Sequence, residues 1–193
     1  SLISIILMRT AGCHCVNLGA CKRGSIGMGQ KTDDALTLRK LTLADAPFIV
    51  RLLNEPSWLQ YIGDRKVRTK ADAETYLREG PISMYEQHGF GLYLVEYERQ
   101  PAGLCGLLKR DTLPRPDLGF ALLPEFSGRG IAYEASSIVL RAAREQLELK
   151  SICAITRPDN QRSISLLERL GFCFEREFSD HGESLKLYSL ALR

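Results

Sequence analysis

The sequence predicts an α/β domain in which helices pack on the faces of one mixed β-sheet. Short runs with the apolar alternation of strands are separated by segments in which apolar residues recur at helical spacing. In chain order the pattern is strand, helices, three strands, helix, strand, helix and two strands, and this mixture favours helices layered on a sheet. With 193 residues the chain is long enough for one domain with a sizeable core.

The domain is expected to cover residues 35–193, after an N-terminal extension at 1–34. An apolar run at 2–8 is too short to span a membrane, and no basic residue precedes it, so a signal peptide is not favoured. We interpret 1–34 as a tag remnant, a disordered segment or residues upstream of a start at Met28, and leave it out of the fold prediction. No later stretch has the length and apolarity of a membrane helix.

The first half of the domain is expected to be mostly helical after one strand. In order, its elements are a strand at 36–41, a helix that begins at Thr42 or Asp45 and is ended by Pro56, a loop or broken helix at 58–67, a helix from Thr69 to Leu77, and a helical turn opened by Pro81. The first helix is predicted because Ala46, Ile49 and Leu53 fall on one side of it. Thr69 is a suitable N-cap for the second.

The second half is expected to be rich in strands, with two helices between them. In order, its elements are strands at 91–96, 104–108 and 117–123, a helix at 131–147, a strand at 151–156, a helix at 160–170, and strands at 172–178 and 185–191, with a turn at 100–102 between the first two strands. Ile131, Ala135, Val139 and Ala143 give the long helix its apolar spacing. Gly171 is suited to the position just past the end of the other helix.

The most informative segment is 127–132, which lies between a predicted strand and the longest predicted helix. Gly128 and Gly130 stand one residue apart, so the backbone can turn tightly and approach a ligand without a Cβ in the way. The free amides and the dipole of the following helix favour a pyrophosphate there, and Arg129 could add a charge-assisted contact. The alternative is a plain strand-to-helix turn. The segment is not a Walker loop, since no Lys-Ser or Lys-Thr follows.

Three segments together resemble the GNAT N-acetyltransferase family. Residues 127–132 are similar to its acyl-CoA loop, residues 117–122 to its central strand, and residues 160–163 with 166–172 to its Asn-x-x-Ser … Glu-Lys-Leu-Gly-Phe segment. The resemblance covers residues 36–190 and points to the branch that contains the ribosomal-protein-alanine acetyltransferases. It implies the GNAT fold, a mixed and mostly antiparallel central sheet flanked by helices, with acetyl-CoA as acyl donor and no metal.

The resemblance also implies which residues contact acetyl-CoA. They are Phe120, Ala121 and Leu122 in the central strand, Ser127, Gly128, Arg129, Gly130, Ile131 and Ala132 in the loop, and Asn160 and Ser163 in the last helix. Glu125 departs from the family pattern, which has Gln or Arg there, and a carboxylate near phosphates is unfavourable unless it points away. Asn160 is equally an ordinary helix N-cap, and capping does not exclude contact with the ligand.

Acetyl transfer from a thioester to an amine needs a neutral amine, hydrogen-bond donors for the oxyanion and a proton for the leaving thiolate. Asp117 is the candidate base, with a solvated residue at the start of a strand as the alternative. Ser163 is the candidate acid. Many family members have a Tyr seven residues after the Asn, but Leu167 stands there and cannot donate a proton. Tyr133, a water molecule or no discrete acid are the alternatives.

The amine acceptor is expected to bind at segment 54–90. Trp58, Tyr61, Asp64 and Arg65 are candidates for the acceptor site; in the alternative, the aromatic residues belong to the core, and Asp64 and Arg65 form a surface pair. The acceptor would be the N-terminal amine of a protein or a small molecule. A non-catalytic acyl-CoA-binding or regulatory module is the alternative function, and Leu167 supports it.

Charge and cysteine usage limit the remaining partners. The formal net charge of +3 is too small to indicate nucleic acid, and we expect neither nucleic-acid nor membrane partners, a cytoplasmic location, and a monomer or homodimer. Cys13, Cys15 and Cys21 lack the C-x-x-C spacing of structural zinc sites, so no metal is expected. Cys105, Cys153 and Cys173 stand singly in apolar runs and are expected to be buried free thiols.

Overall fold

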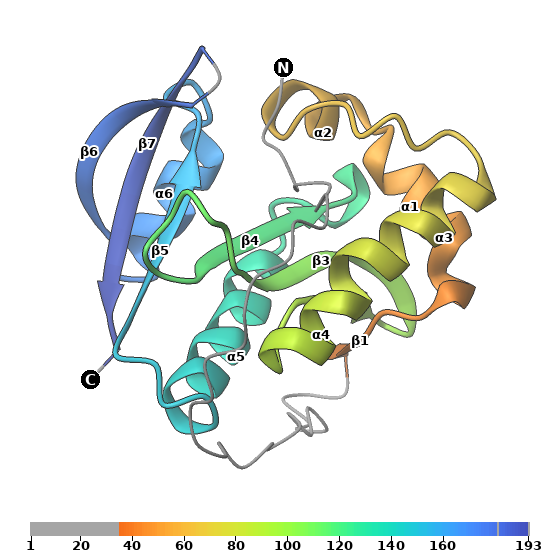
Figure 1. The fold of residues 1–193 in the computed structure, drawn as a ribbon, viewed down its shortest axis with the longest axis horizontal. Coiled ribbons are helices and arrows are strands. Elements are labelled where there is room, and N and C mark those ends of the chain that lie inside the picture. Colours follow the sequence, from red (N-terminus) through yellow and green to blue (C-terminus); the bar gives the residue numbers. More distant parts are fainter. Residues whose placement is uncertain (1–34, 181, 193) are drawn as a thin grey trace, which may run out of the picture.

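The computed structural model describes residues 35–180 and 182–192, which form one seven-stranded sheet with helices packed on it (Figure 1). The strand order is β1-β2-β3-β4-β5-β7-β6, and every neighbouring pair is antiparallel except β4 and β5. The prediction of a mixed, mostly antiparallel sheet flanked by helices is therefore confirmed. The predicted extension at 1–34, with its three cysteines, lies outside the described residues.

The helices and strands follow the predicted order. They are β1 (Leu36–Lys40), the 3₁₀ turn η1 (Leu43–Asp45), α1 (Ala46–Leu53), α2 (Pro56–Tyr61), α3 (Lys70–Leu77), the π-helical turn η2 (Arg78–Ile82), α4 (Ser83–His88), β2 (Leu92–Tyr97), β3 (Gln100–Leu108), β4 (Asp117–Leu122), the 3₁₀ turn η3 (Pro124–Phe126), α5 (Ile131–Glu145), β5 (Ser151–Thr156), α6 (Gln161–Arg169), β6 (Cys173–Asp180) and β7 (Glu183–Ala191).

The longest helix, α5, packs against the sheet because its apolar residues recur every four positions. Ile131, Ala135, Val139 and Ala143 are all buried, and the helix contacts β1, β3 and β4. Burying a side chain of the size of Ile131 or Val139 contributes about 1.5–3 kcal/mol. This packing holds the start of α5, and the turn that precedes it, beside the middle of the sheet.

The sheet is split between its two central strands. β3 and β4 pair along the whole of β4, from Asp117 to Leu122, but β4 and β5 pair only at Asp117 and Cys153. Beyond that pair the two parallel strands separate, so the backbone of residues 118–122 has no partner strand on its β5 side. An unpaired strand edge can bind an extended ligand through its backbone groups.

The β2–β3 hairpin turns earlier than predicted. The sequence pattern predicts a turn at 100–102, whereas Glu98 and Arg99 form it, with positive φ angles of 50° and 65°. Positive φ at both central residues matches the twist of a two-residue hairpin. Pro101 is tolerated because it lies beside the bulge at Ala102 in β3 itself, and before the pairing with β4 begins at Gly103.

Two prolines have positions that differ from the prediction. Pro56 is predicted to end the first helix, but α1 ends at Leu53 and Pro56 begins α2. A proline is tolerated at the first position of a helix, because the N–H of that residue makes no hydrogen bond within the helix. Pro81 is predicted to open a helical turn, but it lies inside η2, which joins α3 to α4. A proline has no backbone N–H to donate within a helix, and here Pro81 lies within the wider π-helical turn.

The end of α6 follows the prediction. Gly171 comes after the helix with a φ angle of 89°. The amides of Gly171 and Phe172 donate to the carbonyl oxygens of Glu168 and Leu167, respectively, which is the Schellman arrangement at a helix end.

Cys105 and Cys153 are buried free thiols, as predicted. The prediction that Cys173 is buried is wrong, because this thiol is exposed. It lies on β6, the strand at the edge of the sheet, where most side chains are exposed.

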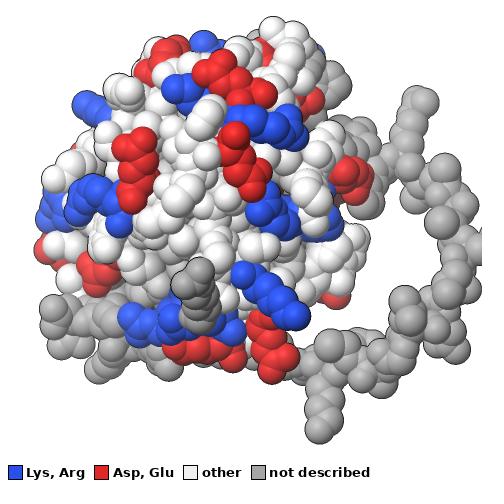
Figure 2. Space-filling model, turned by 90° about the vertical axis from the view of Figure 1, so that its left-hand side faces the viewer, with Lys and Arg blue, Asp and Glu red and all other residues white. Residues whose placement is uncertain are grey.

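Charged groups of both signs are interleaved on the face that includes the β6 edge. Figure 2 views this face, the left-hand side of Figure 1, and shows basic and acidic side chains beside one another. The ion pairs Arg115–Glu175 and Arg157–Asp159 are examples from the β5–β7 half of the sheet. Within residues 35–180 and 182–192, no helix is long and apolar enough to cross a membrane.

Candidate active site

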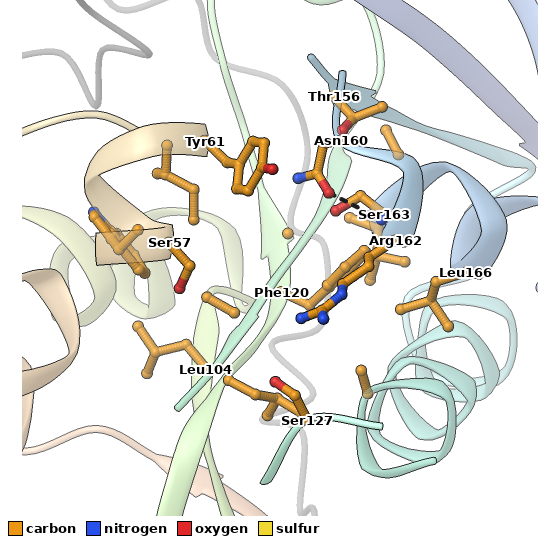
Figure 3. A pocket seen from close by; sticks show the side chains of 18 of the residues that line it. Ser57, Tyr61, Leu104, Phe120, Ser127, Thr156, Asn160, Arg162, Ser163 and Leu166 are labelled. Atoms are coloured by element: carbon orange, nitrogen blue, oxygen red, sulfur yellow. Dashed lines mark hydrogen bonds between the residues drawn. The ribbon is translucent and has the colours of Figure 1, made fainter. Parts of the chain in front are cut away.

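A cavity of about 1040 Å³ lies where β4 and β5 separate (Figure 3). Its walls come from α2 and the loop after it, from α3, β3 and β4, from the turn before α5, and from the end of β5 and the start of α6. In Figure 3, Ser57 and Tyr61 of α2 lie on one side and Asn160 and Ser163 on the other, with Phe120 of β4 between them. Segments far apart in the sequence therefore build one site.

Residues 127–132, here called the glycine turn, provide backbone amides at the cavity wall. Gly128 and Gly130 have left-handed φ angles of 76° and 80°, and Gly130 is the N-cap of α5. The amide of Glu134 donates to the carbonyl oxygen of Gly130 over 3.1 Å, so the amides that precede it at the helix start have no acceptor within the helix. A Cβ at either glycine would meet no protein atom within 4 Å. The space beside the turn is free for a ligand.

Two charged side chains near the glycine turn have partners elsewhere. Arg51 of α1 forms an ion pair with Glu125 over 2.5 Å, so a guanidinium neutralises the carboxylate that departs from the family pattern. The guanidinium of Arg129 lies over the ring of Tyr97, 4.6 Å from its centroid, and 4.0 Å from Glu98. Arg129 does not line the cavity, so the structure does not bring its side chain to the predicted contact.

The other residues predicted to contact acetyl-CoA all line this cavity. They are Phe120, Ala121, Leu122, Ser127, Gly128, Gly130, Ile131, Ala132, Asn160 and Ser163. The first three belong to the part of β4 that has no partner strand on its β5 side. Backbone amides at such an edge can hydrogen-bond an extended ligand or polarise a carbonyl group.

Asn160 and Ser163 lie at the start of α6. The Asn160 side chain accepts a hydrogen bond from the Ser163 amide over 3.1 Å, so Asn160 caps the helix. It also points across the cavity toward the Tyr61 hydroxyl (Figure 3). Leu167 is a buried core residue that also lines the cavity, so an apolar side chain fills the position at which the resemblance implies a tyrosine.

Asp117, the predicted base, is buried at the start of β4 and held by Arg110. The Arg110 Nε lies 3.0 Å from each carboxylate oxygen, and the Asp117 side chain is only 1% exposed. Burial raises the pKa of the Asp117 carboxyl group above its usual value, while the Arg110 guanidinium opposes this rise. A carboxylate held in this way is poorly placed to take a proton from an amine, and its geometry favours a positioning role.

Three of the four predicted acceptor residues line the cavity: Trp58, Tyr61 and Arg65. Asp64 does not line it, because its carboxylate accepts hydrogen bonds from the Arg68 side chain and the Lys66 amide, both over 2.7 Å. Asp64 is therefore paired with Arg68 rather than with Arg65. Trp58 also belongs to the hydrophobic core, so this residue both lines the cavity and packs in the core.

Several cavity residues are missed by the sequence analysis. Those with ionisable side chains are Glu55, Tyr76, Arg110, Arg162 and Arg169. Arg162 and Arg169 stand seven positions apart on α6, a spacing that places both on one helix face, and this signal could have identified them. Glu55, Tyr76 and Arg110 have no local signal, because only the folding of distant segments brings them to the cavity.

Comparisons with known proteins agree with this geometry. The family model described as "Acetyltransferase (GNAT) domain" matches residues 35–173. The chain is 26% identical over 100 residues to the ribosomal protein uS5-alanine N-acetyltransferase of Escherichia coli (strain K12), covering 49% of this chain and 52% of that protein. It is 22% identical over 148 residues to the spermidine N(1)-acetyltransferase of the same strain, covering 74% of this chain and 75% of the relative.

Solved structures share the fold. RimL, a ribosomal L7/L12 α-N-protein acetyltransferase whose structure contains coenzyme A, matches with a TM-score of 0.73 and 18% identity. The match covers 83% of this chain and 96% of the RimL chain.

Proposed function

Because the chain belongs to the GNAT acetyltransferase family, we propose that it transfers the acetyl group of acetyl-CoA to a primary amine. One observation supports this most directly: the glycine turn, the unpaired edge of β4 and the start of α6 meet at a single cavity. This arrangement offers a pyrophosphate site and a strand edge for an extended ligand side by side.

The glycine turn is assigned to the pyrophosphate of acetyl-CoA. Its free amides and the N-terminal end of the α5 dipole favour a negatively charged group. Arg162 and Arg169 of α6 line the same cavity and add positive charge. Residues 118–122 of β4 then offer backbone hydrogen bonds to the pantetheine arm and to the thioester carbonyl at its end.

In the proposed reaction the amine nitrogen attacks the thioester carbonyl carbon. The C–N bond forms, the C–S bond breaks, and the products are the N-acetylated amine and the thiol of CoA. Amides of β4 stabilise the negative charge on the carbonyl oxygen in the tetrahedral intermediate. Holding the two reactants together in one cavity supplies a large part of the rate enhancement. The proton lost by the amine is balanced by the proton gained by the leaving thiolate.

Proton transfers are assigned to groups that are free to make them. The amine must be neutral to attack, so its proton has to leave first. Glu55 lines the cavity beside α2 and has no ion pair with any other residue in the described ranges. We assign it, with water, as the base in place of Asp117. Ser163 stays the proposed proton donor to the thiolate.

The acceptor is proposed to be either a protein N-terminus or a small-molecule amine. By their names, one relative acts on an alanine of a ribosomal protein and another on spermidine. A non-catalytic acyl-CoA-binding module is the second candidate, because the buried Leu167 replaces the acid of many relatives.

Turnover with a panel of amines and peptides tests the proposal. We expect release of CoA thiol in equal amount to N-acetylated product, identified by mass spectrometry. Binding of acetyl-CoA without product from any amine or peptide would instead favour the binding module. Absence of both binding and turnover would contradict the assignment of the cavity itself.

A further inference from the structure

The end of the cavity opposite the glycine turn is rich in uncompensated positive charge. Arg65, from the loop after α2, and Arg110, from the loop after β3, both line it. Asp117 is the only acidic partner of Arg110 among the described residues, and Arg65 has no ion pair with any of them. Arg65 and Arg110 therefore have one ion-pair partner between them, Asp117, among the described residues.

Arg65 and Tyr76 also have buried polar atoms without a hydrogen-bond partner. The Nε of Arg65 and the hydroxyl of Tyr76 are both sealed from solvent and unpaired. An unsatisfied buried donor costs about 1–3 kcal/mol, and more when the group is charged. Native structures leave few buried polar groups unsatisfied, and a bound ligand or an ordered water molecule is a common reason for those that remain.

Arg110 has donors left over for a ligand. Its Nε is used for Asp117, and its Nη groups make no hydrogen bond to another described residue. The side chain is 15% exposed and lines the cavity. Burial raises the pKa of Tyr76 to about 12, and the charges of Arg65 and Arg110 oppose that rise, which agrees with the three groups being neighbours.

This charge lies too far from the glycine turn to serve the pyrophosphate. Asp117, which holds Arg110, is at the first residue of β4, and Leu122 is at the last, before the turn. Five residue steps of a strand span about 17 Å. The positive end therefore faces the acceptor side of the proposed thioester position.

We propose that Arg65, Tyr76 and Arg110 form an anion subsite that binds a carboxylate of the acceptor molecule, and that the enzyme acetylates amines which also bear such a carboxylate. This inference rests on the proposed function for the transfer step, but the binding of the carboxylate is independent of turnover. The guanidiniums offer donors suited to a carboxylate. A polyamine would instead bring more positive charge to this end and is a poor acceptor.

Matched acceptors test the subsite. The amines 6-aminohexanoate and 6-aminohexanamide differ only in that the first has a carboxylate where the second has an amide. The peptides Ala-Ala-Glu and Ala-Ala-Gln, both amidated at the C-terminus, present the same difference in a side chain. We expect kcat/KM to favour at least one carboxylate member by tenfold or more, about 1.4 kcal/mol, and spermidine to be the weakest acceptor. Whichever pair shows the preference identifies the source of the carboxylate.

Variants assign the preference to named residues. Arg65→Gln should bring the ratio between the matched acceptors close to one, and Tyr76→Phe should reduce it. Arg68→Gln is the control, because Arg68 stands on the same loop but pairs with Asp64; it should keep the wild-type ratio. Equal kcat/KM for both members of each pair, or an unchanged ratio in Arg65→Gln, would overturn the subsite.

A binding measurement separates this result from failure of the proposed transfer. Calorimetry with the acetylated products, 6-acetamidohexanoate and 6-acetamidohexanamide, in the presence of CoA needs no turnover. We expect the carboxylate product to bind at least tenfold more tightly to the wild type and without advantage to Arg65→Gln. Turnover without this difference would contradict the subsite alone, and the difference without turnover would contradict the transfer alone.

Discussion

At the scale of single residues, the pair of Arg110 and Asp117 determines how the acceptor end of the cavity is arranged. Both carboxylate oxygens of Asp117 accept from one nitrogen of Arg110, and the carboxylate is shielded from water. Removing one partner from a buried ion pair leaves the other charge uncompensated, which typically costs about 3–5 kcal/mol.

We expect Asp117→Asn to lower the free energy of unfolding by about 3–5 kcal/mol, measured by denaturant unfolding. Adding Arg110→Gln to this variant should recover part of the loss, because the uncompensated charge is then gone. A double-mutant cycle measures the coupling between the two residues. Additive effects of the two substitutions would show that the ion pair is not the reason for the loss.

Turnover measurements on Asp117→Asn and on Glu55→Gln distinguish the two candidate bases. Glu55→Gln should lower turnover at neutral pH by about a hundredfold, the usual scale for a general base, and the loss should shrink as pH rises because the amine then deprotonates without help. Turnover per folded molecule of Asp117→Asn should not show this loss at neutral pH that shrinks as pH rises. The reverse pattern would return the role of base to Asp117.

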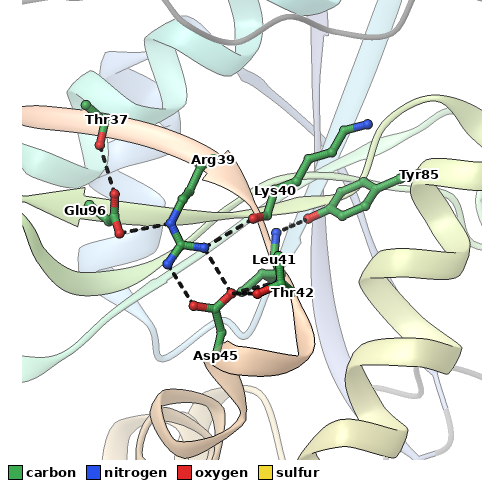
Figure 4. Close-up of polar contacts among 8 residues, drawn as sticks. All are labelled: Thr37, Arg39, Lys40, Leu41, Thr42, Asp45, Tyr85 and Glu96. Atoms are coloured by element: carbon green, nitrogen blue, oxygen red, sulfur yellow. Dashed lines mark hydrogen bonds and ion pairs between the residues drawn. The ribbon is translucent and has the colours of Figure 1, made fainter.

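At the scale of elements, a polar network joins β1 to the start of α1 (Figure 4). The guanidinium of Arg39 on β1 contacts both carboxylate oxygens of Asp45, over 2.7 and 3.0 Å, and Glu96 on β2 over 2.9 Å. The carboxylate of Asp45 also accepts from the amide of Thr42 over 2.8 Å. Burial alone would raise the pKa of Asp45, but the hydrogen bonds from Arg39 and Thr42 outweigh it and lower the pKa below 3.8.

The lowered pKa makes the contribution of Asp45 dependent on pH. A carboxyl group with a lower pKa in the folded state stabilises the fold above its ordinary pKa and loses that contribution as pH falls through the folded value. We expect Asp45→Asn to lower the free energy of unfolding by about 1–3 kcal/mol at neutral pH. The difference from wild type should shrink as the pH falls below 3.8.

Urea unfolding curves of both proteins between neutral and acidic pH measure this difference. Asp111→Asn, at an exposed loop position, is the control and should follow the wild-type curve. A difference between Asp45→Asn and wild type that stays constant into acid would contradict the role of the ionised carboxylate.

At the scale of the whole molecule, ligand binding and stability are coupled because the cavity joins segments from both halves of the domain. A ligand that binds only the folded state stabilises it by about 2.7 kcal/mol at a concentration 100 times its Kd. For a domain of this size that corresponds to a rise in Tm of roughly 5–10 °C. We expect saturating acetyl-CoA to produce such a rise in thermal melts.

Gly130→Val should remove most of this rise. Valine at a φ angle of 80° is strained, and its side chain would occupy the space beside the turn; we expect acetyl-CoA binding to weaken at least tenfold, about 1.4 kcal/mol. Gly182→Val is the matched control, since Gly182 has a φ angle of 84° and open space around it but does not line the cavity. Gly182→Val should lower the Tm of the ligand-free protein without reducing the rise in Tm that acetyl-CoA produces. An equal rise in Tm with acetyl-CoA in the wild type, Gly130→Val and Gly182→Val would mean that the glycine turn has no part in binding.

The sequence by itself determined the features that depend on near neighbours in the chain. The apolar spacing of α5, the Schellman end of α6 at Gly171 and the glycine turn all follow from short-range geometry, and the structure has each of them. The position of Pro81 inside a continuous helical segment is the limit of such reasoning, because local preference alone does not reveal a π-helical turn.

Only the tertiary structure decided which side chains meet. Glu125 is neutralised by Arg51, 74 residues away, and Arg65 and Tyr76 share a wall with Arg110. These contacts depend on which faces of α1, α2 and α3 pack toward the split between β4 and β5, and nothing in the local sequence encodes that. The charge of each residue was visible in the sequence, but whether that charge has a partner depends on distances between segments that only the fold brings together.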